Sequence, residues 1–583
     1  MRKKRNKKRG FTLIEMLATV VILGVIGLIA TPVVTNIVND AKVGAFKRSV
    51  EGITTAIDNK YAVSLLAGNV EETSYIYADG KSTLGDLDRY FKGKRPDEAI
   101  FHINTNGEME YVIYDKDLKV CASKSFNSDD YKVTKDVLDK NKCIGKLSIN
   151  LLTDTWIHDF TGLKNYEDKI ISADFVDHMN IPEGAITYDM SLDKDGSIIG
   201  WLESVGNDRY KLYIGSEGKI YSSTSFDTFF DMRALETVNL ENLNTINATN
   251  MSGLFEYCVK LKRIYNIQNL DTRNVTDMGY MFVGCESLEE LDVSHFDTSN
   301  VETMYVMFED LKKVPVLDVS HFDTSKVTNM YGMFSDCNSV KVLDVSHFDT
   351  SNVTNMARMF HGCNSVANLD LSNFNTSKVT EMSYMFWECS SLSNLNISNF
   401  DTSKVTTFQG TFGRLSGLTS ELNLSTLNTS SATNMLNMFS DYPLTSLDLS
   451  NFDTRKVTTM DGMFSQSKNL TSLNLSSFNT SNVTNMDSMF FALHALPSIN
   501  LSNFNTSKVT SMEWMFNQCS NLTELDLSSF NIGKVNNMEE IFASTPKLNV
   551  VYVNSNWDTS NVKNKKDMFS ASKINHVTVK STN

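Results

Sequence analysis

The sequence predicts an α/β chain with three parts: a long N-terminal transmembrane and stem helix, a small α+β head, and a solenoid of strand-plus-helix units. Three observations lead to this prediction. An apolar run follows a basic N-terminus, short alternating segments come next, and phenylalanine then recurs every 25 to 27 residues. The expected segments are 1–10, 11–66, 67–147, 148–228 and 229–583, and the last would hold about 13 units of 26 residues.

The N-terminus has the pattern of a membrane segment with one unusual residue. Seven of the first ten residues are Lys or Arg, and residues 11–30 are almost entirely apolar. About 20 apolar residues cross a bilayer as a helix, and the basic residues before them predict a cytoplasmic N-terminus. Glu15 lies inside the run, where a carboxylate costs free energy and therefore marks a function. If the chain is cut after Gly10, the new α-amino group of Phe11 becomes a cation that can pair with a neighbour's Glu15.

These residues resemble a known export and assembly signal. The basic leader, Gly10, the run Phe11-Thr12-Leu13-Ile14-Glu15 and Pro32 are similar to the prepilin N-terminal motif of type IV pilins and pseudopilins. The resemblance implies cleavage after Gly10 by a prepilin peptidase, N-methylation of Phe11, and assembly with other pilin subunits through Glu15. It predicts a single-pass membrane protein with the bulk of the chain extracellular, in a surface pilus if it assembles. The alternative is a generic membrane anchor that is never assembled.

The stem and head are predicted from spacing. Apolar residues at helical spacing continue from 33 to 66, so a stem helix from 11 to 66 would be about 80 Å long. Residues 100–103 and 111–114 alternate around a turn and predict a hairpin, which fits the small sheet of a pilin-like head. Cys121 and Cys143 are the two cysteines outside the repeats, and both a disulfide and two free thiols remain open. Residues 148–228 predict a strand-rich connector and N-terminal cap.

Most of the chain is one repeat. Within the unit that starts at Phe322, the residues Val327, Met330, Phe334 and Cys337 have spacings of 3, 4 and 3, which predict one face of a short helix. Leu343 and Val345 alternate as a minimal strand, and Phe348 of the next unit is expected to stack on Phe322. At about 4.8 Å per unit, the stack would be on the order of 60 Å long. The register phenylalanines that define the units are Phe255, Phe282, Phe308, Phe334, Phe360, Phe386, Phe412, Phe439, Phe464, Phe490, Phe516, Phe542 and Phe569.

The repeat also resembles a known class. The run Leu-Asp-Val-Ser-His-Phe-Asp-Thr-Ser-Asn-Val and the Met-x-x-Met-Phe-x-x-Cys pattern are similar to BspA-like leucine-rich-repeat surface proteins, over about residues 220–583. The resemblance implies a surface-displayed solenoid that functions in adhesion to a macromolecule or host surface. It does not identify the ligand or the face that binds it.

Three positions of the repeat unit, here called slots, carry Cys, Asp/Asn or His in several units, and each has a structural and a functional interpretation. The cysteines could form a metal ladder, but Leu311, Leu415 and Leu493 share their slot, which favours core packing. The Asp/Asn slot could hold calcium, but frequent Asn favours backbone bonding. His295, His321 and His347 could form a metal or pH-sensing patch, but Asn and Ser elsewhere favour a simple polar surface. We therefore expect no metal and no cofactor. The slots are Cys258, Cys285, Cys337, Cys363, Cys389 and Cys519, and Asp297, Asp323, Asp349, Asn375, Asp401, Asn428, Asp453, Asn479, Asn505 and Asn531.

The sequence favours a binding protein over an enzyme. The net charge of −15 argues against nucleic acid as a partner. No catalytic constellation is present; a cell-wall-active enzyme that uses Asp174 and Asp177 is the weakest alternative. We predict a minor pilin or pseudopilin that displays the solenoid for adhesion. The unassembled anchor is the main rival, and it differs in predicting indifference to Glu15→Ala.

Overall fold

The computed structural model describes residues 40–58, 73–78, 81–82, 98–103, 109–124, 131–135, 150–152 and 163–580, apart from 193 and 195. The chain divides into two compact parts, Met1–Ile149 and Asn150–Asn583, which we call the N-terminal domain and the repeat domain. Gly10, Phe11, Glu15 and the predicted transmembrane segment lie outside the described residues. Within the described ranges, no helix is long and apolar enough to cross a membrane.

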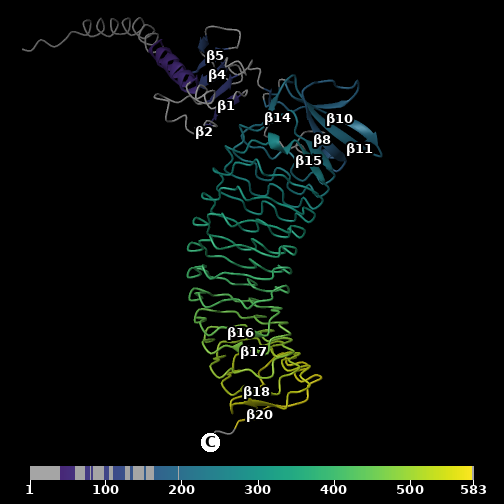
Figure 1. The fold of residues 1–583 in the computed structure, drawn as a ribbon, viewed down its shortest axis with the longest axis vertical. Helices are drawn as coiled ribbons and strands as arrows, with labels where there is room; N and C mark the ends of the chain where they lie inside the picture. The colour runs from purple at the N-terminus through teal and green to yellow at the C-terminus, as the bar shows by residue number, and fades with distance from the viewer. Residues whose placement is uncertain are drawn as a thin grey trace, which may run out of the picture. The chain divides into compact units, whose positions relative to one another are not determined.

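The N-terminal domain contains a helix over residues 40–58 and an antiparallel sheet (Figure 1). The helix is part of the predicted stem. The predicted hairpin is confirmed, because Ile100 pairs with Val112 across β3 and β4. The strand order is β2-β1-β3-β4-β5-β6. The strands are β1 (Thr73–Ala78), β2 (Lys81–Ser82), β3 (Glu98–Ile103), β4 (Met109–Asp115), β5 (Val120–Lys124) and β6 (Lys132–Lys135).

One core joins that helix to the sheet. Val50 and Ile57 of the helix pack with Phe101, Ile113 and Ala122 of three different strands, and all five are buried. The helix positions are seven residues apart and so lie on one face. This core therefore depends on residues brought together from distant parts of the sequence.

The repeat domain begins with a mixed sheet of order β15-β13-β8-β11-β10-β9. Parallel pairs such as Ala173 with Leu212 and with Val238 connect the strand-rich region directly to the first repeat strands. Residues 163–228 therefore belong to the same compact domain as the repeats. A second sheet has the order β14-β12-β7. The elements are β7 (Asn150–Leu151), η2 (Leu163–Asn165), β8 (Ile170–Val176), β9 (Ile186–Asp189), β10 (Ile199–Gly206), β11 (Arg209–Gly215), β12 (Ile220–Tyr221), β13 (Thr237–Asn239), β14 (Leu243–Asn244), β15 (Arg263–Tyr265) and η3 (Ile267–Asn269).

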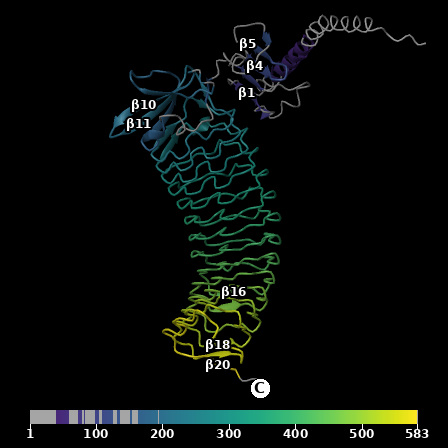
Figure 2. The ribbon, with the colours of Figure 1, turned by 180° about the vertical axis from the view of Figure 1, so that it is seen from behind.

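The repeats form a long stack of similar loops, seen from two sides in Figures 1 and 2. Parallel bridges connect successive units from Ser225 to Asn564. Named strands recur only toward the end of the described stack: β16 (Ser446–Asp448), β17 (Ser472–Asn474), β18 (Glu524–Leu527), β19 (Val550–Val553) and β20 (Thr578–Val579). The stack is therefore held by single bridges and turns more than by regular strands.

Each repeat unit contains a ribbon of overlapping turns whose alternate N–H groups bond to the next unit. The N–H groups of Met330, Gly332, Phe334 and Asp336 donate to the carbonyls of Asn355, Ala357, Met359 and His361, at 2.7 to 3.0 Å. The N–H groups between them close turns: those of Met333, Ser335 and Cys337 donate to the carbonyls of Met330, Gly332 and Phe334. Buried backbone polar groups are therefore satisfied without a helix or a regular strand.

The predicted helix in each unit is wrong. An α-helix needs right-handed dihedrals throughout, but Gly332 and Asp336 have φ angles of 59° and 56°. The turn ribbon nevertheless buries Val327, Met330 and Phe334 completely, so spacings of 3 and 4 select the same inward residues as a helix would. The predicted strand around Asp344 is also absent, although Leu343 and Val345 are buried as expected.

An aromatic ladder of register phenylalanines runs through the stack, and the predicted column of opening phenylalanines is present in part of it. Phe334 stacks on Phe308 and Phe360 at 5.8 and 5.9 Å between ring centroids. Phe322 and Phe348 instead lie tilted against Phe308 and Phe334. The register phenylalanines therefore form one ladder. The opening phenylalanines form the predicted column in other units, with ring centroids 6.3 to 6.5 Å apart: Phe374 stacks on Phe400, and Phe452, Phe478, Phe504 and Phe530 stack in succession.

Candidate binding surface

The turn ribbon presents one row of side chains on the outside of the repeat domain. The first methionine of each ribbon is buried, and the residue one or two positions after it lies at the surface. Bonding between units aligns these positions along the stack. We call the following residues the outer row: Tyr280, Tyr305, Tyr331, Arg358, Tyr384, Gln409, Asp461, Asp487, Glu513 and Glu539.

The first half of the outer row is aromatic. Tyr305 lies 5.0 Å from Tyr280 and 4.9 Å from Tyr331, measured between ring centroids, and it stacks on Tyr331 with an angle of 10°. Tyr280 is 39% exposed, while Tyr305 and Tyr331 are half-buried. Tyr305 and Tyr331 thus cover one face of each other, whereas Tyr280 is tilted by 44° against Tyr305.

Arg358 belongs to the aromatic half, and a second pair, Arg414 with Trp387, lies next to Tyr384. The Arg358 guanidinium lies 5.6 Å from the centre of the Tyr384 ring, and that of Arg414 lies 5.1 Å from Trp387. Arg414 also pairs with Glu388. Cation–π contacts of this kind hold both partners in place.

Glycine makes room for these rings. Gly410 has a φ of +62°, and a Cβ atom there would overlap the ring of Tyr384. A Cβ atom on Gly413 would overlap Trp387 in the same way. Tyr384 and Trp387 therefore lie close to the backbone of the following unit, where glycines permit the approach.

The second half of the outer row is acidic. Asp461, Asp487, Glu513 and Glu539 occupy the same position in consecutive units. Burial, together with the nearby carboxylates of Asp487 and Glu513, raises the pKa of Asp461 to about 6. Neutral groups solvate the others: Glu513 N–H and the Ser511 hydroxyl donate to Asp487, and the Asn537 amide donates to Glu513 at 2.7 Å.

Cations are scarce along the acidic half. Lys566 lies 3.8 Å from Glu539 at its far end. Across the part of the chain that the structure describes, no lysine or arginine forms a salt bridge with Asp461, Asp487 or Glu513. The row therefore changes from aromatic to acidic along the stack, and the unit that carries Leu436 separates the two halves.

The repeat cysteines are core residues, as predicted. All six are free and buried. The thiol of Cys337 donates to the carbonyl of Phe308 at 3.2 Å, and the Ser467 hydroxyl makes the same contact to Phe439. Burial raises the pKa of Cys389 and Cys519 to about 12, which keeps these thiols protonated and unreactive.

The Asp/Asn slot bonds to backbone, also as predicted. Asp323 accepts from the N–H of Ser325 at 2.9 Å, and Asn375 accepts from that of Ser377 at 3.1 Å. The neighbouring threonine adds a hydrogen-bonded ladder that was not predicted from the sequence. Thr350 is fully buried, donates to the carbonyl of Asn375 at 3.0 Å and accepts from the Asn375 N–H at 2.8 Å.

The three histidines lie beside the phenylalanine that opens each unit. His295, His321 and His347 contact the next residue edge-on, with centroids 4.8, 5.0 and 5.2 Å apart. Burial lowers the pKa of His295. In the described ranges, no group of three or more His, Cys, Asp or Glu side chains could hold a metal ion.

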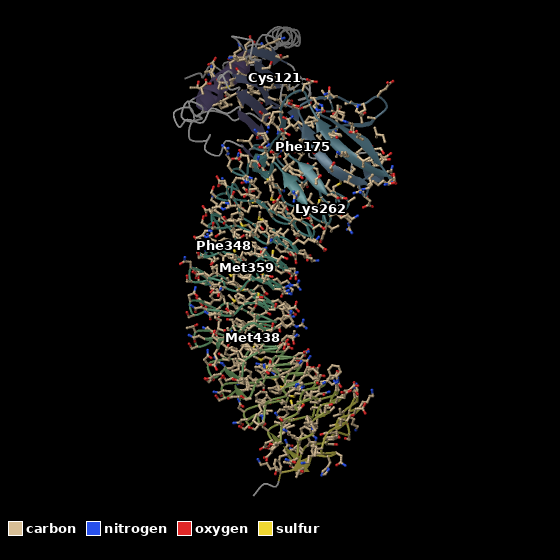
Figure 3. All side chains as sticks on the ribbon, turned by 45° about the vertical axis from the view of Figure 1, so that its right-hand side comes forward. Cys121, Phe175, Lys262, Phe348, Met359 and Met438 are labelled. Carbon is tan, nitrogen blue, oxygen red and sulfur yellow. The ribbon has the colours of Figure 1, made fainter. Side chains whose placement is uncertain are left out.

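The remaining predicted residues are scattered. Cys121 is buried on β5 and is disulfide-bonded, and Figure 3 marks its position. Cys143 lies outside the described residues, so its pairing with Cys121 stays a prediction. Asp174 lies on β8, where burial raises its pKa against the opposing effect of Lys211. Asp177 follows the end of that strand.

The outer row is hard to predict from the sequence, because a repeat is recognised by the residues that recur in every unit. The residues of the outer row vary from unit to unit, so they are not recognised as part of the repeat pattern that the constant Met and Phe define. Comparing the residue after the first methionine across units would have exposed Tyr305 and Tyr331 early in the stack and Asp487 and Glu513 later.

Two protein-family models match this chain, one over the repeats and one near the N-terminus. One model, described as "Mycoplasma protein of unknown function, DUF285", matches residues 224–342, 314–423, 415–498 and 472–581. These matches cover more than half of the chain. The chain belongs to the DUF285 family. A second model, the prokaryotic N-terminal methylation motif, matches residues 5–31. The DUF285 repeats therefore stand on a chain that begins with a prepilin-like motif.

Two further comparisons add little. A search of curated proteins found no match. Among solved structures, the "Crystal structure of TLR13-ssRNA13 complex" matches at 15% sequence identity with a TM-score of 0.18, covering 54% of this chain. The chain spans about half the length of that solved chain, 50%. At this TM-score the likeness supports no argument about the function of the DUF285 repeats.

Proposed function

We propose that this chain is a minor pilin or pseudopilin that displays its repeat domain at the cell surface for adhesion or macromolecule binding. The observation that carries the proposal is the methylation motif at residues 5–31 on the same chain as a long repeat stack. The motif implies processing by a prepilin peptidase and assembly with other pilins. In this proposal Gly10 and Phe11 flank the cleavage site, Phe11 is N-methylated and Glu15 pairs during assembly.

The repeat domain supports a binding role more than a catalytic one. A solenoid offers an extended surface suited to a macromolecule. The outer row supplies such a surface, with Tyr and Arg side chains of the kind that dominate protein interfaces. We propose no enzymatic activity for this chain. We call the subunit minor because a domain this large on every subunit would crowd a fibre.

The first test is the N-terminus of protein extracted from the cell surface. Intact-mass and N-terminal analysis should give a chain that begins at N-methylated Phe11, and one retaining residues 1–10 when the prepilin peptidase is deleted. A chain that keeps Met1 to Gly10 in peptidase-positive cells would reduce the N-terminus to a membrane anchor.

The second test separates assembly from display. Glu15→Gln should abolish recovery of the chain in sheared filaments, whereas Glu51→Gln, the same change in the helix over residues 40–58, should not. Equal recovery of both variants would favour the unassembled surface protein. Adhesion of the same cells to host-matrix proteins is measured in parallel, because display without assembly can still support binding.

A further inference from the structure

We infer that the outer row binds an extended polypeptide whose apolar side chains cover the tyrosines and whose basic side chains cover the acidic residues. This inference rests on the proposed binding function and names its surface and its partner class. Tyr305 and Tyr331 mark the first half of the row, and Asp461, Asp487 and Glu513 mark the second.

The state of the aromatic rings favours a protein partner over a glycan. Sugars stack on free ring faces, but Tyr305 and Tyr331 already stack on each other at 4.9 Å. Arg358 covers Tyr384, and Arg414 covers Trp387. Tyrosine and arginine side chains that are held in place in this way are typical of the anchoring residues in protein interfaces.

Charge complementarity predicts the side chains of the partner segment that lies on the acidic half of the outer row. Three carboxylates in consecutive units, Asp461, Asp487 and Glu513, repel one another, and no described lysine or arginine pairs with them. A partner with Lys or Arg side chains relieves that repulsion, and like charges on a wrong partner add to it. The acidic half therefore selects for basic segments and against acidic ones.

The geometry suits an extended chain laid along the stack. Successive units are about 4.8 Å apart, so the span from Tyr305 to Glu513 is roughly 40 Å. An extended polypeptide rises about 3.3 Å per residue and covers that span with roughly 12 residues. A single partner strand can thus contact both halves of the row.

The repeat itself supplies substitutions that the fold accepts. Ser252 and Ser383 occupy the slot of Tyr305 and Tyr331, so the aromatic variant is Tyr305→Ser/Tyr331→Ser. The acidic variant is Asp461→Asn/Asp487→Asn/Glu513→Gln. Its matched control, Asp318→Asn/Asp344→Asn/Asp370→Asn, makes the same charge change at a slot where other units carry Asn396 and Asn423. Val316→Asn/Val342→Asn is the aromatic control, since these exposed valines share a slot with Asn368.

The probes are 16-residue peptides, with binding to the full chain in detergent measured by fluorescence anisotropy. One peptide carries four Leu-Ser pairs followed by four Lys-Ser pairs, and a second has the reverse order. A third peptide has the sequence of the first with every Lys replaced by Glu. We expect one of the two Lys peptides to bind at least about ten times more tightly than the Glu peptide. The acidic and aromatic variants should each weaken that binding about tenfold, and the two controls should change it less than about twofold.

Several results would overturn the inference. These are equal losses in the acidic variant and its control, no binding of either Lys peptide, or binding of a neutral dextran that depends on Tyr305 and Tyr331. Circular dichroism of each variant excludes unfolding as the cause. If the wild-type chain supports adhesion but the outer-row variants adhere equally well, the proposed function survives and only this surface is wrong.

Discussion

The two domains assemble their cores from different sequence separations, and this difference predicts how each responds to damage. In the N-terminal domain, Val50 packs with Phe101 and Ile113, so one core depends on residues far apart in the sequence. In the repeat domain, Phe334 contacts Phe308 and Phe360, its counterparts in the adjacent units. A repeat stack is therefore expected to fail locally, and the N-terminal domain as a whole.

The largest effect should come from removing one ring of the ladder. Phe334→Ala should cost about 3–5 kcal/mol of unfolding free energy, because Phe334 is fully buried and contacts a ring on each side. Hydrogen exchange should accelerate around Phe308 to Phe360 and leave β18 and β19 protected. Ile113→Ala should instead expose β3, β4 and β5 together. Uniform loss of protection throughout the repeat stack would contradict the local model.

A smaller loss should follow from removing a buried hydroxyl. Thr350→Val keeps the shape but leaves the N–H and carbonyl of Asn375 without their partner, at a cost of about 1–3 kcal/mol. Thr350→Ser keeps both bonds and should cost less. Denaturant unfolding distinguishes the two variants, and equal stability of Thr350→Val and wild type would mean that the threonine ladder contributes nothing.

A Gly→Ala substitution should change the free energy of unfolding in opposite directions in the two domains. Gly44 lies in the helix over residues 40–58, and Ala there should stabilise by about 0.5–1 kcal/mol. Gly410 has a φ of +62° beneath the Tyr384 ring, so Gly410→Ala should destabilise by about 1–3 kcal/mol. Differential scanning calorimetry of both variants measures the signs. Stabilisation by Gly410→Ala would show that the turn ribbon relaxes easily.

The sequence predicted the inward residues better than the backbone that carries them. Met330, Phe334 and Cys337 were assigned to the core correctly, because a period near 3.6 and a ribbon of overlapping turns place the same residues inside. An α-helix and the turn ribbon differ in the acceptors of alternate backbone N–H groups. In the ribbon these acceptors are carbonyls of the adjacent unit, which the sequence of one unit does not indicate. The positive φ angles of Asp336 and Arg358 could not be predicted from the sequence, because neither residue type requires a positive φ angle.

The outer row was unpredictable for another reason. A repeat is recognised by what stays constant, whereas Tyr305, Asp461 and Glu513 occupy a position that varies. Their alignment becomes visible only once the bonding between units fixes the register. The Asp/Asn and Cys slots were interpreted correctly because substitution among units, Asn for Asp and Leu for Cys, already excluded a strict ligand role.

The smallest predicted effect tests the electrostatics of the two aspartates in a single repeat unit. Burial and neighbouring carboxylates raise the pKa of Asp461 from 3.8 to about 6, so the folded state binds the proton more tightly than the unfolded state. Stability from this group is present below pH 3.8 and is lost as the pH rises through 6. Asp453 is the opposite case: its bond to Arg455 lowers its pKa, and its contribution is lost as the pH falls through that lowered value. Relative to wild type, Asp461→Asn should therefore gain stability between pH 4 and 6.5, whereas Asp453→Asn should lose stability as the pH rises from the lowered pKa of Asp453 to its ordinary value of 3.8. Thermal unfolding across this range checks both signs, and a flat difference for Asp461→Asn would show that the acidic half of the outer row carries no stored repulsion.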